Sequence, residues 1–587
     1  MIAVPTARRT GPESGSDQAL PDAVNALLVT LALVALAFGV RATSGLWEAP
    51  GGRIIAPNTA DAFHYTWWLG HTPHAISQGE SPFFTRDMNW PTGVSAMNNT
   101  TLLLPAVLLF PVTWLAGPLV TLNLLNLLAV PLCFAGGYWA LRRALGLPAG
   151  PAAIGAVCFA ISPAVVNSLV GHITMSLAAT LPVLIGLSVQ AWRAEPTVSR
   201  PGVWLGLVAL LQVFTGEEVL FQAGFGALLV ALVAAVGRPR ETRAGFGRLL
   251  RNLGVAFAVF LPVAAYPLYL QFLGPMKHHG SPFLLDYYAA DLLGFTTQTS
   301  GLLLHSEAAA EQSSKFPGGI EEHLAFLGWP LIITGAAALV LGRRNLAICC
   351  AAVGLLVSGV LSLGAKIWVD GLQTDVRGPY WILQKLPVTE ASLASRFGLL
   401  TVLFAAALLA LAVHELRRVG YPFAAITAAV LCLLPLLPAK VTTVDAPQVP
   451  AYFTTAATQL PKGTNVLLLP YPWAGAAQTM YWQSAADYRF QMPGGYFLGP
   501  NERGEARISG AQPLPTGRML LEVQRSGQIP ALDEATRAQA QKDLQAWQSE
   551  LIVLGPDNNH EALKQVVTYL LGRPPTQQGG VAVWDLR

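Results

Sequence analysis

AVNALLVTLALVALAFGV, residues 23–40, is an apolar run without a single charged side chain. A helix needs about 20 mostly apolar residues to cross the hydrocarbon core of a bilayer. Runs of this kind recur along the 587 residues of the chain, of which 53% are hydrophobic and only 12% charged. A soluble domain carries about 25% charged residues. The sequence therefore predicts a mainly α-helical, polytopic membrane protein.

Arginine pairs mark the ends of several runs, as at Arg142–Arg143, Arg343–Arg344 and Arg417–Arg418. Basic residues of membrane proteins collect on the cytoplasmic side. Placing every arginine cluster there predicts a multi-pass protein of the plasma membrane with its N-terminus inside and its C-terminus outside. We expect about eleven spans, near residues 23–40, 119–141, 150–168, 174–192, 202–217, 219–237, 252–273, 323–341, 346–363, 397–415 and 421–438.

Three segments follow from this topology. We expect a disordered cytoplasmic terminus over residues 1–22, a transmembrane helical bundle over 23–438 and an extracytoplasmic domain over 439–587. The stretch TLLLPAVLLFPVTWLA, residues 101–116, leaves one choice open, because counting it as a further span would move the later arginine clusters outside. It is short and contains two prolines, which favours a helix that lies in the outer interface or re-enters the membrane, within a first outer loop of residues 43–118.

The tail after residue 438 differs in kind from the rest of the chain. Three strand-like runs, NVLLLPYP (465–472), ELIVLGPD (550–557) and GVAVWDL (580–586), alternate with two helical runs at 532–550 and 560–572. This alternation predicts a small α/β domain. The segment YWQSAADYRFQMPGGYF (481–497) is rich in aromatic residues, which suit either sugar stacking or, more commonly, a domain core.

The first outer loop contains TADAFHYTWWLGHTPHA, residues 59–75. A helix capped by Asn58 or Thr59 would place Asp61, His64 and Trp68 on one stripe. We expect this helix to lie in the membrane interface, with its tryptophans at the headgroup level. A carboxylate held there can act as a general base on an acceptor hydroxyl, whereas the plainer interpretation is that Asp61 only caps a surface helix.

His64 and Trp68 of this stripe are candidates for binding a donor or an acceptor, and so are four further polar residues. His172 follows Gly171 at the outer end of a span, and Glu217 and Glu218 interrupt an apolar stretch, where acids usually face a cavity or a partner. Asp87, in TRDMNW, is the remaining acid candidate of the first loop. A structural role, as a helix-end histidine or as acids in a solvated turn, is the alternative for these residues.

Basic residues of the outer loops are candidates for binding phosphate. Lys277 and His278 lie in GPMKHHGSPF, and Arg377 and Arg396 flank the last outer loop before a span. An arginine on the outer side runs against the usual charge distribution, and binding an anionic lipid headgroup would explain it. For Arg396, a salt bridge to Glu390 or Asp375 is the alternative explanation. The paired histidines lack other ligands at the spacing of a zinc site.

Several stretches together resemble the GT-C superfamily of membrane glycosyltransferases, and more closely actinobacterial polytopic proteins described as glycosyltransferases, with some likeness to YfhO-type proteins. They are DAFHYTWWLGHTPHAISQGESPFFT, NWPTGVSAMNNTTLLLPAVLLFPVTWLAGPLVTLNLL, ISPAVVNSLVGHITMSLA, TGEEVLF, EHLAFLGWPLI, LASRFGLL and QTMYWQSAADYRFQMPGGYF.

The resemblance implies a GT-C-like bundle, a sugar donor linked to polyprenyl phosphate, and an acid of the first outer loop, here Asp61, as the catalytic base. Ala60 precedes it where the family often has glycine, and no D-x-D motif is present. We therefore predict no obligatory metal, although some members of the superfamily use a divalent cation.

Taken together, these features predict an enzyme that transfers a sugar from a polyprenyl-phosphate donor to an envelope glycan, glycolipid or protein acceptor on the outer face. Membrane lipids are expected partners and nucleic acid is not. The alternatives are a flippase or transporter of lipid-linked sugars and a non-catalytic envelope scaffold. A flippase would be marked by paired inverted repeats with broken helices, and the sequence shows no clear repeat.

Overall fold

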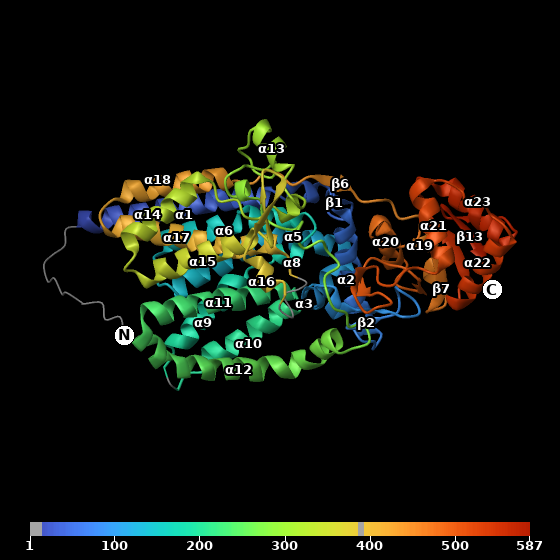
Figure 1. Cartoon of the computed structure of the whole chain (residues 1–587), viewed down its shortest axis with the longest axis horizontal. Coiled ribbons are helices and arrows are strands. Elements are labelled where there is room, and N and C mark those ends of the chain that lie inside the picture. The colour runs from blue at the N-terminus through green and yellow to red at the C-terminus, as the bar shows by residue number, and fades with distance from the viewer. Residues whose placement is uncertain (1–14, 196, 386–391) are drawn as a thin grey trace.

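The structure, a computed structural model, describes residues 15–195, 197–385 and 392–587. Every apolar run predicted as a span contains a helix, although some runs are helical over only part of their length, and these helices pack side by side in one bundle (Figure 1). They are α1 (Gly15–Arg41), α5 (Pro118–Arg143), α6 (Ala149–Ala160), α9 (Thr180–Arg193), α10 (Arg200–Val213), α11 (Glu217–Gly237), α12 (Pro239–Phe272), α14 (Trp329–Gly342), α15 (Leu346–Ser362), α17 (Gly398–Arg418) and α18 (Pro422–Leu433).

The first helix begins earlier than the sequence predicted. Helix α1 starts at Gly15, so the boundary at residue 22 falls inside it, and residues 1–14 of the predicted disordered terminus lie outside the described residues. Within the described ranges, five helices are long and apolar enough to cross a membrane, or six if one bent pair counts as a span. The remaining helices of the bundle are shorter, and the count of about eleven spans stays a prediction.

The bent pair consists of α6 and the turn that follows it. Helix α7 (Pro163–Val166) and the 3-10 helix η3 (Asn167–Leu169) lie at 45° to α6. Pro163 opens α7, a position that proline favours because its missing N–H has no partner there anyway. After η3 the chain turns through Gly171 and His172 into the short helix α8 (Ile173–Ser176), so the bend delivers this polar turn to one end of the bundle.

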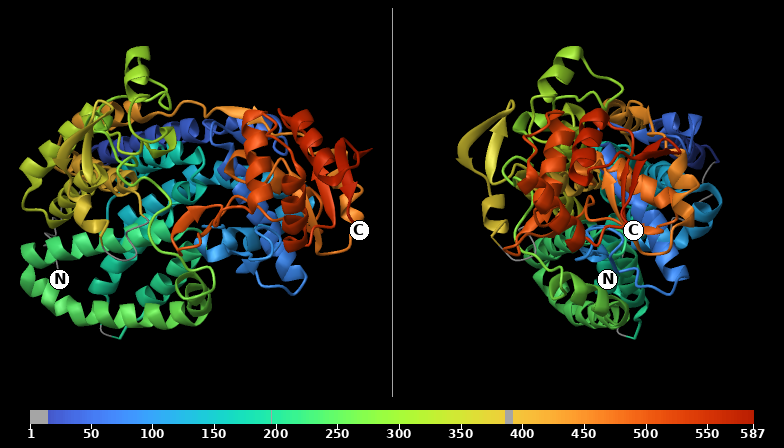
Figure 2. Two further views of the ribbon diagram at one scale, coloured as in Figure 1. Left: turned by 45° about the vertical axis from the view of Figure 1, so that its right-hand side comes forward. Right: turned by 90° about the vertical axis from the view of Figure 1, so that its right-hand side faces the viewer.

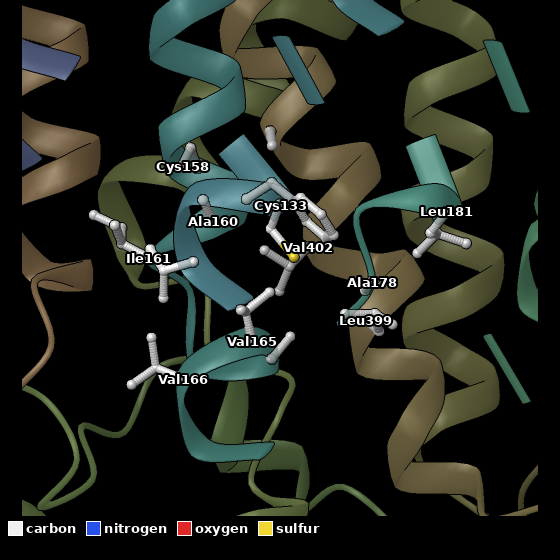
Figure 3. Close-up of a cluster of buried hydrophobic side chains, with 14 of the residues drawn as sticks. Cys133, Cys158, Ala160, Ile161, Val165, Val166, Ala178, Leu181, Leu399 and Val402 are labelled. Atoms are coloured by element: carbon white, nitrogen blue, oxygen red, sulfur yellow. The ribbon is translucent and has the colours of Figure 1, made fainter. Parts of the chain in front are cut away.

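Buried hydrophobic side chains of the bundle core pack around α7 (Figure 3). Figure 3 shows Cys133 of α5, Val165 of α7 and Val402 of α17 pointing toward one another, and all three side chains are buried. Cys133 Sγ also donates to the backbone oxygen of Ser176, 3.2 Å away. The broken segment α7–α8 is therefore fixed by close packing against α5 and α17.

Residues 101–116 form two short helices, α3 (Leu103–Leu108) and α4 (Phe110–Ala116), each of which is too short to cross a bilayer alone. Helix α4 has no buried residue, and Trp114 is 79% exposed. An exposed apolar helix of this length is typical of an interfacial segment. The helices therefore agree with the interpretation that this stretch is no full span.

The polar segments gather at the end of the bundle where His172 lies, which we call the Asp61 end (Figures 1 and 2). Helix α2 (Thr59–Ser77) lies between the bundle and the tail. The other elements of the loops are η1 (Ser44–Glu48), β1 (Arg53–Ile55), β2 (Phe84–Thr85), β3 (Val94–Ser95), η2 (Ala96–Asn98), η4 (Leu292–Phe295), α13 (Glu307–Ser313), η5 (Ile320–Glu322), β4 (Lys366–Val369), β5 (Leu372–Arg377), α16 (Tyr380–Leu383), η6 (Ala394–Phe397) and η7 (Leu434–Leu436).

The tail contains a five-stranded mixed sheet of order β12-β13-β11-β7-β8. Strand β7 is parallel to β8 and β11, whereas β13 is antiparallel to β11 and β12. Strand β6 (Thr443–Asp445) begins the tail and pairs with β1. The elements of the tail that follow are α19 (Ala451–Thr454), η8 (Ala457–Gln459), β7 (Thr464–Leu469), η9 (Ala474–Ala476), α20 (Gln478–Ala485), β8 (Phe490–Gln491), β9 (Leu498–Pro500), β10 (Ala506–Ile508), α21 (Pro515–Ser526), α22 (Glu534–Ala546), β11 (Leu551–Leu554), α23 (His560–Leu571), β12 (Thr576–Gln578) and β13 (Val581–Asp585).

The strands β7, β11 and β13 and the helices α22 and α23 coincide with the runs predicted from the sequence. The packing of α2 does not match the prediction. Trp67 and Trp68 are fully buried in one hydrophobic cluster with Trp482 and Phe490 of the tail, so they are not anchors at the headgroup level. The tail covers α2, because a helix this rich in large aromatic side chains gains more from burial against a second apolar surface than from a half-exposed position.

Candidate functional site

Asp61 lies in the first turn of α2 and is capped by Asn58. Asn58 Oδ1 accepts a hydrogen bond from the Asp61 backbone N–H at 3.4 Å, and Asn58 Nδ2 donates to Asp61 Oδ2 at 2.8 Å. The N-terminal end of a helix also favours a negative charge. The Asp61 side chain is 14% exposed. It is thus a fixed and orientated carboxylate that still reaches the surface.

The tail supplies the second contact to Asp61. The hydroxyl of Tyr496 donates to Asp61 Oδ1 at 2.6 Å. Burial raises the pKa of Tyr496 well above its ordinary value, and the charge of Asp61 raises it further. The phenol therefore remains protonated and can only donate to the carboxylate, which couples the position of the tail to that of Asp61.

His172 approaches Asp61 from the bundle. Its Nε2 lies 3.7 Å from Asp61 Oδ2, and its Nδ1 lies 3.5 Å from Glu322 Oε1. Gly171 makes this approach possible, because it has a φ of +115° and a Cβ at this position would lie 2.5 Å from Asn58 Nδ2. The imidazole therefore bridges two carboxylates, one exposed and one buried.

Glu322 is fully buried behind His172 and accepts bonds from Ser395 Oγ at 2.5 Å and from Arg396 Nη2 at 3.1 Å. Burial alone would raise the pKa of Glu322, but the charge of Arg396, the neighbouring His172 and the hydrogen bond from Ser395 outweigh it and lower that pKa below its ordinary value. On its other side, Arg396 pairs with Glu218. The result is a continuous chain of charged and polar groups from Tyr496 through Asp61, His172, Glu322 and Arg396 to Glu218.

These contacts bear on two of the predicted roles. Arg396 pairs with Glu218 and Glu322, so its charge is balanced by two carboxylates; Asp375 is not among these partners, and Glu390 lies outside the described residues. A phosphate would have to replace one of these carboxylates, and phosphate binding by Arg396 stays a prediction. The sequence did not distinguish Glu217 from Glu218. The structure does, because of the two only Glu218 forms an ion pair with Arg396 among the described residues.

A cavity of about 20 Å³ lies beside Asp61, lined by Asn58, Gly171 and two asparagines of α5, Asn123 and Asn126. A space of this size holds about one water molecule. The Oδ1 atoms of Asn123 and Asn126 are buried and have no hydrogen-bond partner among the described residues. The cavity is too small for a sugar, so an acceptor could not bind inside it.

Three predicted residues of the first loop have side chains that are engaged by other residues or buried in this structure. Both ring nitrogens of His64 lie 3.0 Å from backbone oxygens, those of Tyr496 and Asn99. Trp68 is fully buried. Asp87 pairs with His71. His71 lies ten positions after Asp61 in α2, which at the rise of an α-helix is a distance of about 15 Å along its axis. The tail engages His64 and buries Trp68, whereas the Asp87 carboxylate is held by His71 of α2. Donor or acceptor binding by these three residues stays a prediction.

The outer basic residues lie apart from this chain of contacts. Lys277 and Arg377 are exposed, and among the described residues neither forms an ion pair with Asp61 or Glu322. Arg377 lies over the ring of Trp381, at 5.1 Å from its centroid. His278 is half-buried in the same loop as Lys277. Phosphate binding by these three residues stays a prediction.

Sequence reasoning missed Glu322 and underrated Tyr496. Glu322 precedes the apolar run of α14, and an acid beside a span is the same signal that singled out Glu217 and Glu218. Tyr496 belongs to the aromatic tail segment, most of which forms the hydrophobic core there, as Trp482 and Phe490 do. Nothing local in the sequence distinguishes the one tyrosine that reaches Asp61.

Within the described residues, no three His, Cys, Asp or Glu side chains are grouped so that they could hold a metal ion. Asp61 and Glu322, the two acids nearest each other in the chain of contacts, are separated by the imidazole of His172. The possible divalent cation inferred from the resemblance therefore has no evident ligand set in this part of the chain.

Comparisons with known proteins support the fold. No family model matches the sequence, and no curated protein matches it significantly. Among solved structures, the apo oligosaccharyltransferase of Archaeoglobus fulgidus superposes with a TM-score of 0.50 at 12% identity, covering 90% of this chain and 69% of its own. The mycobacterial arabinofuranosyltransferase AftD superposes with a TM-score of 0.54 at 16% identity, covering 96% of this chain but only 40% of its own.

These identities are low, so the likeness concerns the fold and not the chemistry. Both proteins are membrane glycosyltransferases, and the superposition on each extends over at least 90% of this chain. The chain therefore shares the fold of these two transferases over most of its length.

Proposed function

We propose that this protein is a membrane glycosyltransferase that transfers a sugar from a polyprenyl-phosphate donor to an acceptor hydroxyl of the cell envelope. The observation that carries the proposal is the position of Asp61. It is a partly exposed carboxylate at the polar end of a GT-C-like bundle, held by Asn58, Tyr496 and His172. Two solved structures with this fold belong to glycosyltransferases, which supports the reaction class.

In the proposed reaction, Asp61 removes the proton of the acceptor hydroxyl as its oxygen attacks the anomeric carbon. The bond between that carbon and the lipid phosphate oxygen breaks, and its electrons stay on the phosphate. One displacement at one carbon inverts its configuration. The phosphate is a good leaving group, so the step needs a base and no covalent intermediate.

His172 would act through Asp61. Its imidazole lies 3.7 Å from the carboxylate that gains the proton and 3.5 Å from buried Glu322. A histidine between two carboxylates can accept a proton from the first while the second stabilises the resulting charge. Tyr496 donates to Oδ1, whereas Asn58 donates to Oδ2 and His172 lies nearest that oxygen. The acceptor therefore has to use a remaining lone pair of the carboxylate or displace one of these partners.

The test is sugar transfer by the purified full chain carrying Asp61→Asn. Loss of a general base lowers the rate by about 10²–10⁴-fold, while asparagine keeps the shape and an oxygen that can accept from Tyr496. Asp87→Asn is the matched control, because Asp87 is an acid of the same loop that pairs with His71 instead. Equal transfer by Asp61→Asn and the wild type would refute the role of Asp61.

The same preparation distinguishes the two alternative functions. A flippase would move a labelled donor across liposomes without consuming it, and Asp61→Asn would leave this movement intact. A scaffold would neither move nor consume the donor. The sugar and the envelope acceptor would be identified by supplying membrane extracts as acceptors and analysing the labelled product.

A further inference from the structure

A groove of about 610 Å³ lies between the ends of α11 and α15, at the end of the bundle opposite Asp61. It is formed where Gly237 ends α11 and Leu346 begins α15, whereas Glu217 and Ser362 at the other ends of these helices lie toward the Asp61 end. Its volume is within the range of about 300–1,000 Å³ typical of small-molecule sites.

The lining of the groove combines two kinds of side chain. Three arginines, Arg238, Arg343 and Arg344, line the groove at the helix ends, and most of its other lining residues are aliphatic, including Leu232 and Val353. Leu232 is 55% exposed and Val353 is 37% exposed. An apolar channel with a cationic rim at a membrane surface has the polarity of a phospholipid, whose tails are apolar and whose head carries phosphate.

The charge of this rim is not neutralised by the protein. Within the described part of the chain, Arg343 and Arg344 form no ion pair and no side-chain hydrogen bond. Arg238 pairs with Glu241 at 3.3 Å, but both side chains are partly exposed, and such pairs are weak. Two or three arginines are thus available to an anion.

We propose that this groove binds one anionic phospholipid of the cytoplasmic leaflet, with its phosphate between Arg343, Arg344 and Arg238 and its acyl chains along α11 and α15. The positive-inside distribution places this end of the bundle in the leaflet where anionic lipids are found. Arginine suits the phosphate because its planar guanidinium donates two parallel hydrogen bonds. The site is separate from Asp61 and independent of the proposed transfer reaction.

The first experiment measures lipid retention by native mass spectrometry of the detergent-solubilised full chain, with phosphatidylglycerol or phosphatidylcholine added. We expect phosphatidylglycerol to bind more tightly, and the double variant Arg343→Gln/Arg344→Gln to bind it about thirtyfold more weakly. This factor corresponds to about 1 kcal/mol for each arginine near an anionic headgroup.

The matched control is Arg240→Gln/Arg243→Gln. These two exposed arginines of α12 follow Arg238 in the chain but do not line the groove, so the control removes the same charge from the same end of the bundle. Equal weakening by both double variants would mean that only the overall surface charge matters, and would overturn the proposal. So would equal binding of phosphatidylcholine, or retention of undecaprenyl phosphate but not of phosphatidylglycerol.

Cys349 gives a second readout inside the groove. It is half-buried, whereas Cys133, Cys158, Cys350 and Cys432 are buried. We expect phosphatidylglycerol to slow the alkylation of Cys349 by N-ethylmaleimide in the wild type and in the Arg240/Arg243 control, and not in the Arg343/Arg344 variant. Cys349→Ser identifies the labelled site. Alkylation at the same rate with and without phosphatidylglycerol would show that the lipid does not occupy the groove.

Discussion

Replacement of Glu322 by glutamine perturbs the centre of the polar chain behind Asp61. The Glu322 side chain is fully buried, and Ser395, Arg396 and His172 surround its two oxygens. Glutamine has the same shape, but its NH₂ group would face N–H and O–H donors instead of an acceptor. The variant therefore leaves Arg396 with one carboxylate partner in place of two.

The size of the effect follows from that arrangement. Removing one member of a buried ion pair costs about 3–5 kcal/mol, because the other charge is left uncompensated. Arg396 keeps its pair with Glu218, so the lower end of this range applies. We expect Glu322→Gln to lower the free energy of unfolding by about 3 kcal/mol.

The neighbouring acid provides the control. Burial raises the pKa of Glu321, so its charged form is disfavoured in the folded state. Glu321→Gln should therefore change the free energy of unfolding by no more than about 0.5 kcal/mol, or increase it slightly at neutral pH. Adjacent acids with the same substitution would then differ by more than about 2 kcal/mol.

The assay is unfolding of the purified chain in mixed micelles by titration with sodium dodecyl sulfate, followed by tryptophan fluorescence. Arg396→Gln, alone and combined with Glu322→Gln, completes a double-mutant cycle. If the effects add to within about 0.5 kcal/mol, the two residues are not coupled. That result, or equal stability of the two glutamate variants, would refute the reasoning.

Three further predictions concern the same region. Because the pKa of Glu322 is lowered in the folded state, its contribution to stability is complete above its unfolded value of 4.5 and is lost as the pH falls through the folded pKa. The free energy of unfolding should therefore fall less between pH 7 and pH 4 for Glu322→Gln than for the wild type, as measured by unfolding titrations at the two pH values. His172→Gln should reduce kcat for sugar transfer by about 100-fold and flatten its pH profile, with the donor KM unchanged; an unchanged pH profile would leave His172 a purely structural role. Gln483→Leu removes three hydrogen bonds, those to Trp67 Nε1 and to the backbone oxygens of Asp87 and Phe490. The tail should therefore loosen by about 3 kcal/mol, seen as faster limited proteolysis than in the exposed control Gln459→Leu.

Much of the architecture was predictable because its cause is local. The apolar runs from residue 23 onward specify helices through their length and composition, and the tail strands 465–472, 550–557 and 580–586 are short apolar segments between turn residues. Asn58 and Asp61 were identified for the same reason. A capping residue at a helix start, followed by an acid in the first turn, is a pattern of neighbouring residues.

The burial of α2 could not be predicted in this way. A stripe of aromatic residues next to a span fits a membrane interface as well as a protein core, and the choice depends on a partner more than 400 positions away, as in the bond from Trp67 Nε1 to Gln483. The sequence contains both surfaces and does not show that they meet.

The sequence alone determined that this is a membrane bundle with a polar, acid-bearing loop and a mixed tail, because hydrophobicity and periodicity are properties of neighbouring residues. Only the tertiary structure decided that Tyr496, His172 and Glu322 converge on or behind Asp61 and that Arg396 is shared by two carboxylates. Buried charges have to find partners wherever the chain brings them, and those distances are set by packing and not by spacing in the sequence.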